Sequence, residues 1–352
     1  MKDLMTKPGY CETAPDRLDG FALHTLACEW LKQGNPVVAL ELLRAAIDAP
    51  ETIRDSELRA KVLKETGRAY MMQSDWEKAD IFYREAQQAF VLMGNVPGAA
   101  QCARNRANMS FQQGRYQESE NLCEQALQWA SEADDRQLRA TILNTMAAIK
   151  SATGDWPEAL KMFRLCLADF QATENKVRQG YVLLNIGLTQ AELGENDAAI
   201  DSLNKALAIA LEEKDLQLVE ICYQNIAKDY LNQGEIKLAQ SVLAVARKIL
   251  PGLSSAALEA ELNLLECRIL RLSGNIETAD ILLKKTYDMT QAHRLTALEA
   301  DVLLEQGLLA RENGHASQAV AKLDAAINLY RHLGTSKGLH EAVAALEQMK
   351  RS

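Results

Sequence analysis

The sequence has no long hydrophobic run, no excess of positive charge and little proline or glycine, and each absence excludes a class of protein. No run approaches the roughly 18 uninterrupted apolar residues that a membrane-spanning helix needs, so we expect no membrane insertion. The 39 Lys and Arg residues are outnumbered by 48 Asp and Glu, and a net charge of −9 disfavours nucleic-acid binding. With 7 Pro, 18 Gly and 48% hydrophobic residues among 352, collagen-like and disordered chains are excluded. The composition predicts a folded, soluble protein.

The sequence also lacks clusters of chemically reactive residues. Its 7 cysteines form no CxxC pair and no close group with the 5 histidines, so we expect no metal site and no disulfide framework. Lys2, Asp3 and Lys7 interrupt the N-terminus where a secretory signal needs an apolar stretch, and scattered thiols are typical of the cytoplasm. No phosphate-binding glycine loop or group of nucleophiles and bases is present. The sequence therefore predicts a cytoplasmic protein with no cofactor and no enzymatic activity.

What the sequence does contain is a repeat. Turn residues recur every 40 positions, as Gly114 and Gly154 show, and the full series is Gly34, Ser74, Gly114, Gly154, Gly194, Gly234, Gly274 and Gly314. Small residues recur at matched distances on either side of each turn, for example Ala147 and Ala159 around Gly154. Small side chains at matched depths allow two helices to pack closely. Apolar residues between the turns follow helical spacing, so each repeat is predicted to be a helical hairpin.

The repeated positions resemble those of the tetratricopeptide repeat in its 40-residue form, as found in Leu-Gly-Asn-repeat scaffolds, kinesin light chains and bacterial peptide-sensing regulators. Two repeats carry the resemblance most fully, through Leu63, Gly67, Tyr70, Ala79, Tyr83 and Ala86 in one, and Leu183, Gly187, Ala199, Leu203 and Ala206 in the other. The resemblance implies an all-α, right-handed superhelical solenoid of about eight stacked antiparallel helix pairs. We expect a loosely ordered tail at residues 1–17, the array at 18–339 and a capping helix at 336–352.

The same resemblance places a binding site on the concave face, which is formed by the first helix of each repeat. The residues expected there are Lys64, Arg68, Arg104, Asn105, Asn108, Asn144, Tyr181, Asn185, Gln224, Asn225 and Lys228. Three of them, Asn105, Asn185 and Asn225, share one repeat position and are expected to line up along the groove. Asparagine amides both donate and accept hydrogen bonds, so they can bind the backbone of a peptide. The alternative is that these amides bridge neighbouring helices or face water.

The basic residues beside these asparagines favour an acidic partner, although charged residues often simply face solvent. One version of this groove binds the acidic tails of heat-shock chaperones through Lys, Asn, Asn, Lys and Arg. The matching positions here read Lys64, Arg68, Asn105, Thr141 and Thr145. Only the first Lys and one Asn agree, so a chaperone tail is not the expected partner.

The later repeats predict a second, apolar and basic patch for a partner helix or for self-association into a homo-oligomer. Its residues are Leu264, Arg268, Arg271, Leu304 and Arg311. The principal hypothesis is thus a protein-interaction scaffold that binds an extended or helical peptide segment in its groove. The alternative is a regulatory sensor that binds a signalling peptide or small ligand and changes superhelical pitch to control an output partner.

Overall fold

The computed structural model describes residues 18–249, 256–333 and 337–351, all of which form helices or the short turns between them. The predicted all-α fold of repeated helix pairs is confirmed, and no strand occurs in these ranges. The tail expected at residues 1–17 lies outside the described residues, as do the two end residues of the capping segment, 336 and 352. The helices are α1 (Gly20–Lys32), α2 (Pro36–Asp48), α3 (Pro50–Arg54), α4 (Ser56–Met72), α5 (Trp76–Leu92), α6 (Val96–Gln112), α7 (Tyr116–Glu132), α8 (Arg136–Ala152), α9 (Trp156–Ala172), α10 (Lys176–Glu192), α11 (Asn196–Glu213), α12 (Leu216–Asn232), α13 (Ile236–Ile249), α14 (Ala256–Leu272), α15 (Ile276–Ala292), α16 (Thr296–Glu312), α17 (Ala316–Leu333) and α18 (Lys337–Arg351).

Most of the described turns between helices are built from three residues that end one helix and start the next. At the first turn, Gly34 has a φ of +77°, and its N–H donates to the Leu31 carbonyl at 3.2 Å. The N–H of Asn35 donates to the Trp30 carbonyl at 2.9 Å, which completes the left-handed helix ending typical of glycine. The Asn35 side chain also accepts from the N–H of Val38 and thereby caps the next helix.

The left-handed turn position recurs at the described junctions other than the two that flank α3, but glycine does not. Within the helix pairs it is almost always glycine. Between pairs it is Gly94 at one turn, and Asp134, Glu174, Lys214 or Arg294, with φ values between +51° and +58°, at four others. A residue with a Cβ atom is strained in this conformation. The structure therefore keeps one turn geometry even where the sequence does not favour it.

The small residues on either side of each turn lie where two helices meet. Ala107 and Ala147 are fully buried. A Cβ atom on Gly67 would lie 3.0 Å from the ring of Tyr83, and one on Gly187 would lie 2.8 Å from Leu203. The close approach predicted for the two helices of each pair is thus confirmed by the side chains that occupy the space.

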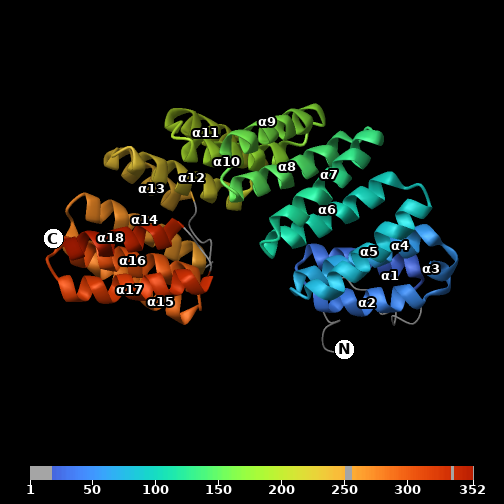
Figure 1. The fold of residues 1–352 in the computed structure, drawn as a ribbon, viewed down its shortest axis with the longest axis horizontal. Coiled ribbons are helices and arrows are strands. Elements are labelled where there is room, and N and C mark those ends of the chain that lie inside the picture. The colour runs from blue at the N-terminus through green and yellow to red at the C-terminus, as the bar shows by residue number, and fades with distance from the viewer. Residues whose placement is uncertain (1–17, 250–255, 334–336, 352) are drawn as a thin grey trace. The chain divides into compact units, whose positions relative to one another are not determined.

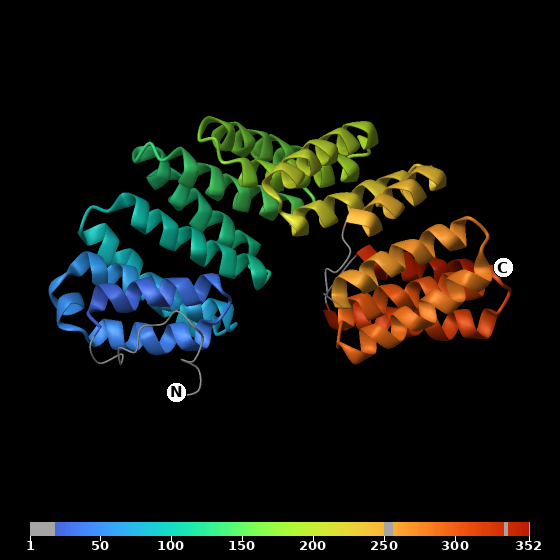
Figure 2. The ribbon, with the colours of Figure 1, turned by 180° about the vertical axis from the view of Figure 1, so that it is seen from behind.

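The chain divides into two units, residues 1–182 and 183–352, and the boundary in the sequence falls within α10. In the first unit the pairs α1–α2, α4–α5, α6–α7 and α8–α9 stack one after another, and the short α3 packs beside α1, α2 and α4 (Figure 1). In the second unit α18 packs on α16 and α17, with Ala342 and Leu346 buried against Leu323 and Tyr330, at the red end of the ribbon in Figure 2. Glu347 on α18 is exposed.

None of the helices in the described ranges is long and apolar enough to cross a bilayer.

Candidate functional site

The first helix of each pair, called the A helix here, carries the residues singled out above; the second is called the B helix. Several polar side chains on successive A helices form hydrogen bonds at a recurring sequence separation of 37 residues. Examples are Lys64 Nζ to Gln101 Oε1 at 3.0 Å and Thr145 Oγ1 to Asn108 Oδ1 at 3.1 Å. Because the repeat is 40 residues long, this separation joins a residue to the position one helical turn earlier on the next A helix. These bonds hold the polar side chains in place.

In the first unit the predicted residues lie on α4, α6, α8 and the start of α10, which we call the A face of the first unit. Lys64, Arg68, Arg104, Asn105, Asn108, Asn144 and Tyr181 are all half-buried there. Glu65 is the carboxylate of this region and lies 3.4 Å from Lys64 Nζ and 3.5 Å from Arg68 Nη1. Arg104 Nη2 donates to Asn105 Oδ1 at 2.7 Å. The A face of the first unit is therefore polar and carries more cations than carboxylates.

In the second unit the predicted residues differ more in accessibility. Lys228 is exposed and Asn185 is half-buried, whereas Gln224 is buried. The Asn225 amide donates to the carbonyl of Ile221 in its own helix at 2.7 Å. One hydrogen bond of the Asn225 amide is thus already made within the helix, and the role of the asparagine row in binding stays a prediction.

A pair of carboxylates lies beside Gln224. Its Nε2 donates to Glu220 Oε1 at 2.9 Å and to Glu261 Oε2 at 2.8 Å, so one amide joins acidic groups of α12 and α14. Burial, and then the nearby negative charge of Glu261, raise the pKa of Glu220 to about 7. This cluster makes Gln224 a structural bridge between helices.

In the apolar and basic patch predicted for the later repeats the two leucines are buried, so the expected apolar surface is wrong; binding by its half-buried arginines stays a prediction. Leu264 and Leu304 are 5% and 1% exposed and pack in the helical core. Arg268 and Arg271 both pair with Glu305, at 2.7 Å and 3.0 Å. The sequence signal that was missed is the 37-residue separation between Arg268 and Glu305.

The arginines of this patch also form contacts with other helices. Arg271 reaches Glu312 as well, and Arg311 donates to Gln348 on α18 at 3.1 Å. These contacts tie α14 to α16 and α16 to α18, so the arginines stabilise the stack of helices in the second unit.

One residue of the A face of the first unit was not predicted from sequence. Arg178, near the start of α10, is exposed and stands at the repeat position that holds the buried leucines Leu58, Leu138, Leu218 and Leu258. An arginine in a row of core leucines breaks the local pattern, and such breaks are expected at functional sites. Aligning the repeats with one another could have revealed Arg178, because other repeats have leucine at this position.

Reactive groups are few in the described part of the chain. No group of three or more His, Cys, Asp or Glu side chains there could hold a metal ion. Six cysteines are free thiols, and all except Cys28 are buried. Cys28 Sγ lies 3.6 Å from His24 Nε2 on α1. Burial raises the pKa of Cys28 and lowers that of His24, which favours the neutral forms of both.

Comparison with known proteins agrees with this architecture. Family models described as tetratricopeptide repeat match residues 24–90 and 99–172. A model described as anaphase-promoting complex subunit 5 matches residues 152–228 and 272–352. Together with the 40-residue helix pairs, the repeat matches show that the chain belongs to the tetratricopeptide-repeat family.

Individual relatives are distant. The chain is 26% identical over 212 residues to the 43 kDa receptor-associated protein of the synapse from Tetronarce californica, a match covering 56% of this chain and 52% of that one. The chain thus spans about half the length of this curated relative. The apo form of the quorum sensor NprR from B. thuringiensis has a TM-score of 0.71 at 12% identity, covering 88% of this chain and 87% of that one. A Rap protein complexed with Competence and Sporulation Factor has a TM-score of 0.61 at 16% identity, covering 92% and 89%. These solved structures share the fold.

Proposed function

We propose that this protein is a non-catalytic interaction scaffold whose A face of the first unit binds an extended or helical peptide segment of a partner protein. The observation that carries the proposal is the row of half-buried polar side chains on successive A helices, of which Lys64 and Asn108 are held by side chains of the next A helix. Membership of a repeat family whose helices expose such faces supports a protein or peptide as the partner.

The physical advantage of this face is preorganisation. Lys64 and Asn108 are held by Gln101 and Thr145 before any partner arrives, so little side-chain entropy remains to be lost on binding. Both side chains keep unused hydrogen-bonding capacity, because an ammonium group has three donors and an amide has two donors besides its oxygen. A peptide laid across α4, α6 and α8 would meet such groups on each helix.

A second candidate function is peptide or small-ligand sensing, in which binding changes the arrangement of the helix pairs and so controls an output partner. The similarity to the quorum sensor NprR favours it. It predicts that a bound ligand alters the solution scattering curve of the whole chain, whereas a passive scaffold keeps one curve with and without ligand.

The test of the scaffold function is affinity capture from a lysate of the source cells, followed by mass spectrometry. The variant Asn108→Ala/Asn144→Ala removes two amides from the A face of the first unit. The matched control is Gln117→Ala/Asn121→Ala, which removes two exposed amides from the B helix α7. We expect a partner to be lost only from the A-face variant, with unchanged thermal unfolding of both proteins. If both variants retain every partner, binding does not use this face.

A further inference from the structure

Arg104 is a half-buried cation whose guanidinium group does not form all of its hydrogen bonds. Its Nη2 donates to Asn105, but its Nε lies buried with no hydrogen-bond partner among the described residues. Burial is the main cause that lowers the pKa of Arg104, and the positive charges of Arg178 and Arg68 lower it further. A guanidinium held in this way costs free energy unless an acceptor completes its hydrogen bonds.

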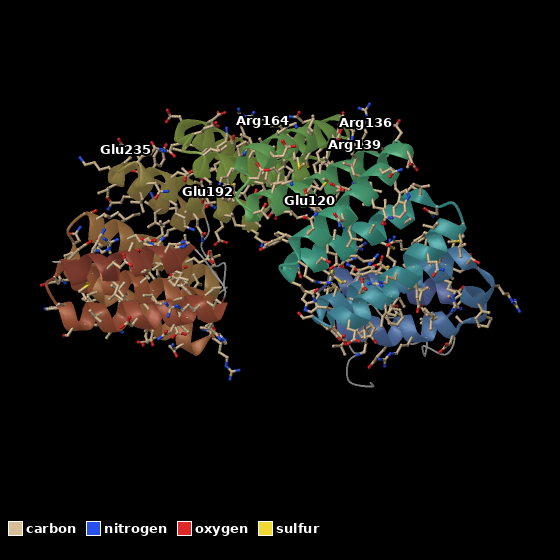
Figure 3. The ribbon with its side chains drawn as sticks, viewed as in Figure 1. Glu120, Arg136, Arg139, Arg164, Glu192 and Glu235 are labelled. Carbon is tan, nitrogen blue, oxygen red and sulfur yellow. The ribbon has the colours of Figure 1, made fainter. Side chains whose placement is uncertain are left out.

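Several other half-buried arginines of the described chain have the carboxylate that Arg104 lacks. Arg106 pairs with Asp80 at 2.8 Å, and Arg139, labelled on α8 in Figure 3, pairs with Asp169 through Nε and Nη2. Arg271 pairs with Glu305. No carboxylate in the described chain makes an ion pair with Arg104, so its charge is balanced by none of its neighbours.

The surroundings of Arg104 add to the positive charge. Lys64 and Arg68 share the single carboxylate of Glu65, at 3.4 Å and 3.5 Å. Arg178 forms no ion pair within the described chain and replaces a leucine of the repeat. Tyr83, buried below this face, also has an Oη atom without a hydrogen-bond partner. Arg68 and Arg178 therefore add positive charge near Arg104, and this region holds two buried polar atoms without a hydrogen-bond partner, Arg104 Nε and Tyr83 Oη.

We propose that Arg104, with Arg68 and Arg178 beside it, is a binding site for an oxyanion carried by a side chain of the bound peptide, either a carboxylate or a phosphoryl group. This inference rests on the proposed function, because the peptide is the one bound on the A face of the first unit. Guanidinium groups bind both kinds of oxyanion through paired, charge-assisted hydrogen bonds, and clusters of arginines are typical of acidic and phosphorylated motifs.

The test is fluorescence polarisation with short, fluorescein-labelled peptide pools of random sequence that differ only at the centre: Glu-Glu, phosphoserine or serine. The variants are Arg104→Gln and Arg178→Leu, the second of which restores the leucine of the repeat and so preserves the core. The control is Arg164→Gln, which removes the same charge from an exposed residue of α9, labelled in Figure 3.

We expect the Glu-Glu or the phosphoserine pool to bind the wild type about ten- to a hundredfold more tightly than the serine pool. Arg104→Gln and Arg178→Leu should remove this preference, while Arg164→Gln retains it; the preferred pool identifies the oxyanion as carboxylate or phosphoryl. If all pools bind equally and Arg104→Gln changes nothing, the oxyanion site is refuted while peptide binding stands. If no pool binds, the peptide-binding function of this face fails as well.

Discussion

Replacement of Glu220 by glutamine should make the protein more stable at high pH and leave it unchanged at low pH. Glu220 is 9% exposed, and its pKa is raised from 4.5 to about 7 by burial and by Glu261. In the folded chain the carboxyl group is therefore protonated over a pH range in which the unfolded chain has lost the proton. The contribution of the protonated Glu220 carboxyl to the free energy of unfolding is fully present below pH 4.5. It is lost as the pH rises through about 7.

The magnitude follows from the two pKa values. At 1.36 kcal/mol per pKa unit, the difference corresponds to about 3 kcal/mol, of which about 2.5 kcal/mol is lost between about pH 5 and pH 8. Glutamine keeps an oxygen that accepts from Gln224 Nε2, as Glu220 Oε1 does at 2.9 Å, but it cannot ionise. The stability difference between Glu220→Gln and wild type should therefore grow by about 2.5 kcal/mol over this range.

Urea unfolding followed by circular dichroism at several pH values measures this difference. The matched control is Glu213→Gln, which removes a carboxylate from an exposed position on α11. We expect the control and the wild type to keep parallel profiles while Glu220→Gln diverges upward. Parallel profiles for all three proteins would show that Glu220 is ionised in the folded state, and the argument from burial and Glu261 would be refuted.

Three further substitutions test the packing, the turns and the buried ion pairs, each by urea unfolding. Gly187→Ala should destabilise the protein by about 1–3 kcal/mol, because the new Cβ would lie 2.8 Å from Leu203; an increase in stability would contradict the close helix contact. Glu174→Gly should stabilise by about 0.5–1 kcal/mol, since φ there is +54°, and a loss of stability would contradict the assigned strain. Glu305→Gln should destabilise by about 3–5 kcal/mol by leaving Arg268 without its carboxylate, and a neutral effect would show that water solvates this arginine.

The fold could be predicted from the sequence because its determinants are local and are repeated. A glycine in a left-handed turn, a capping asparagine such as Asn35 and a buried alanine such as Ala147 each act over one helix pair. A single-residue exception like Ser74 does not hide a pattern that recurs at a fixed period. The short helix α3 was not predicted, because it has no counterpart in the other repeats.

The accessibility of the polar residues was decided only by the tertiary structure. Sequence placed Arg268 and Leu264 on a binding patch, but neighbouring helices bury the leucine and bring Glu305 to the arginine. The same stacking leaves Arg104 without a carboxylate and brings the positive charges of Arg68 and Arg178 near it. The repeat sets where each residue lies on its own helix. The side-chain contacts of that residue depend on residues such as those 37 positions away on the next A helix. The charge and size of these residues vary from repeat to repeat.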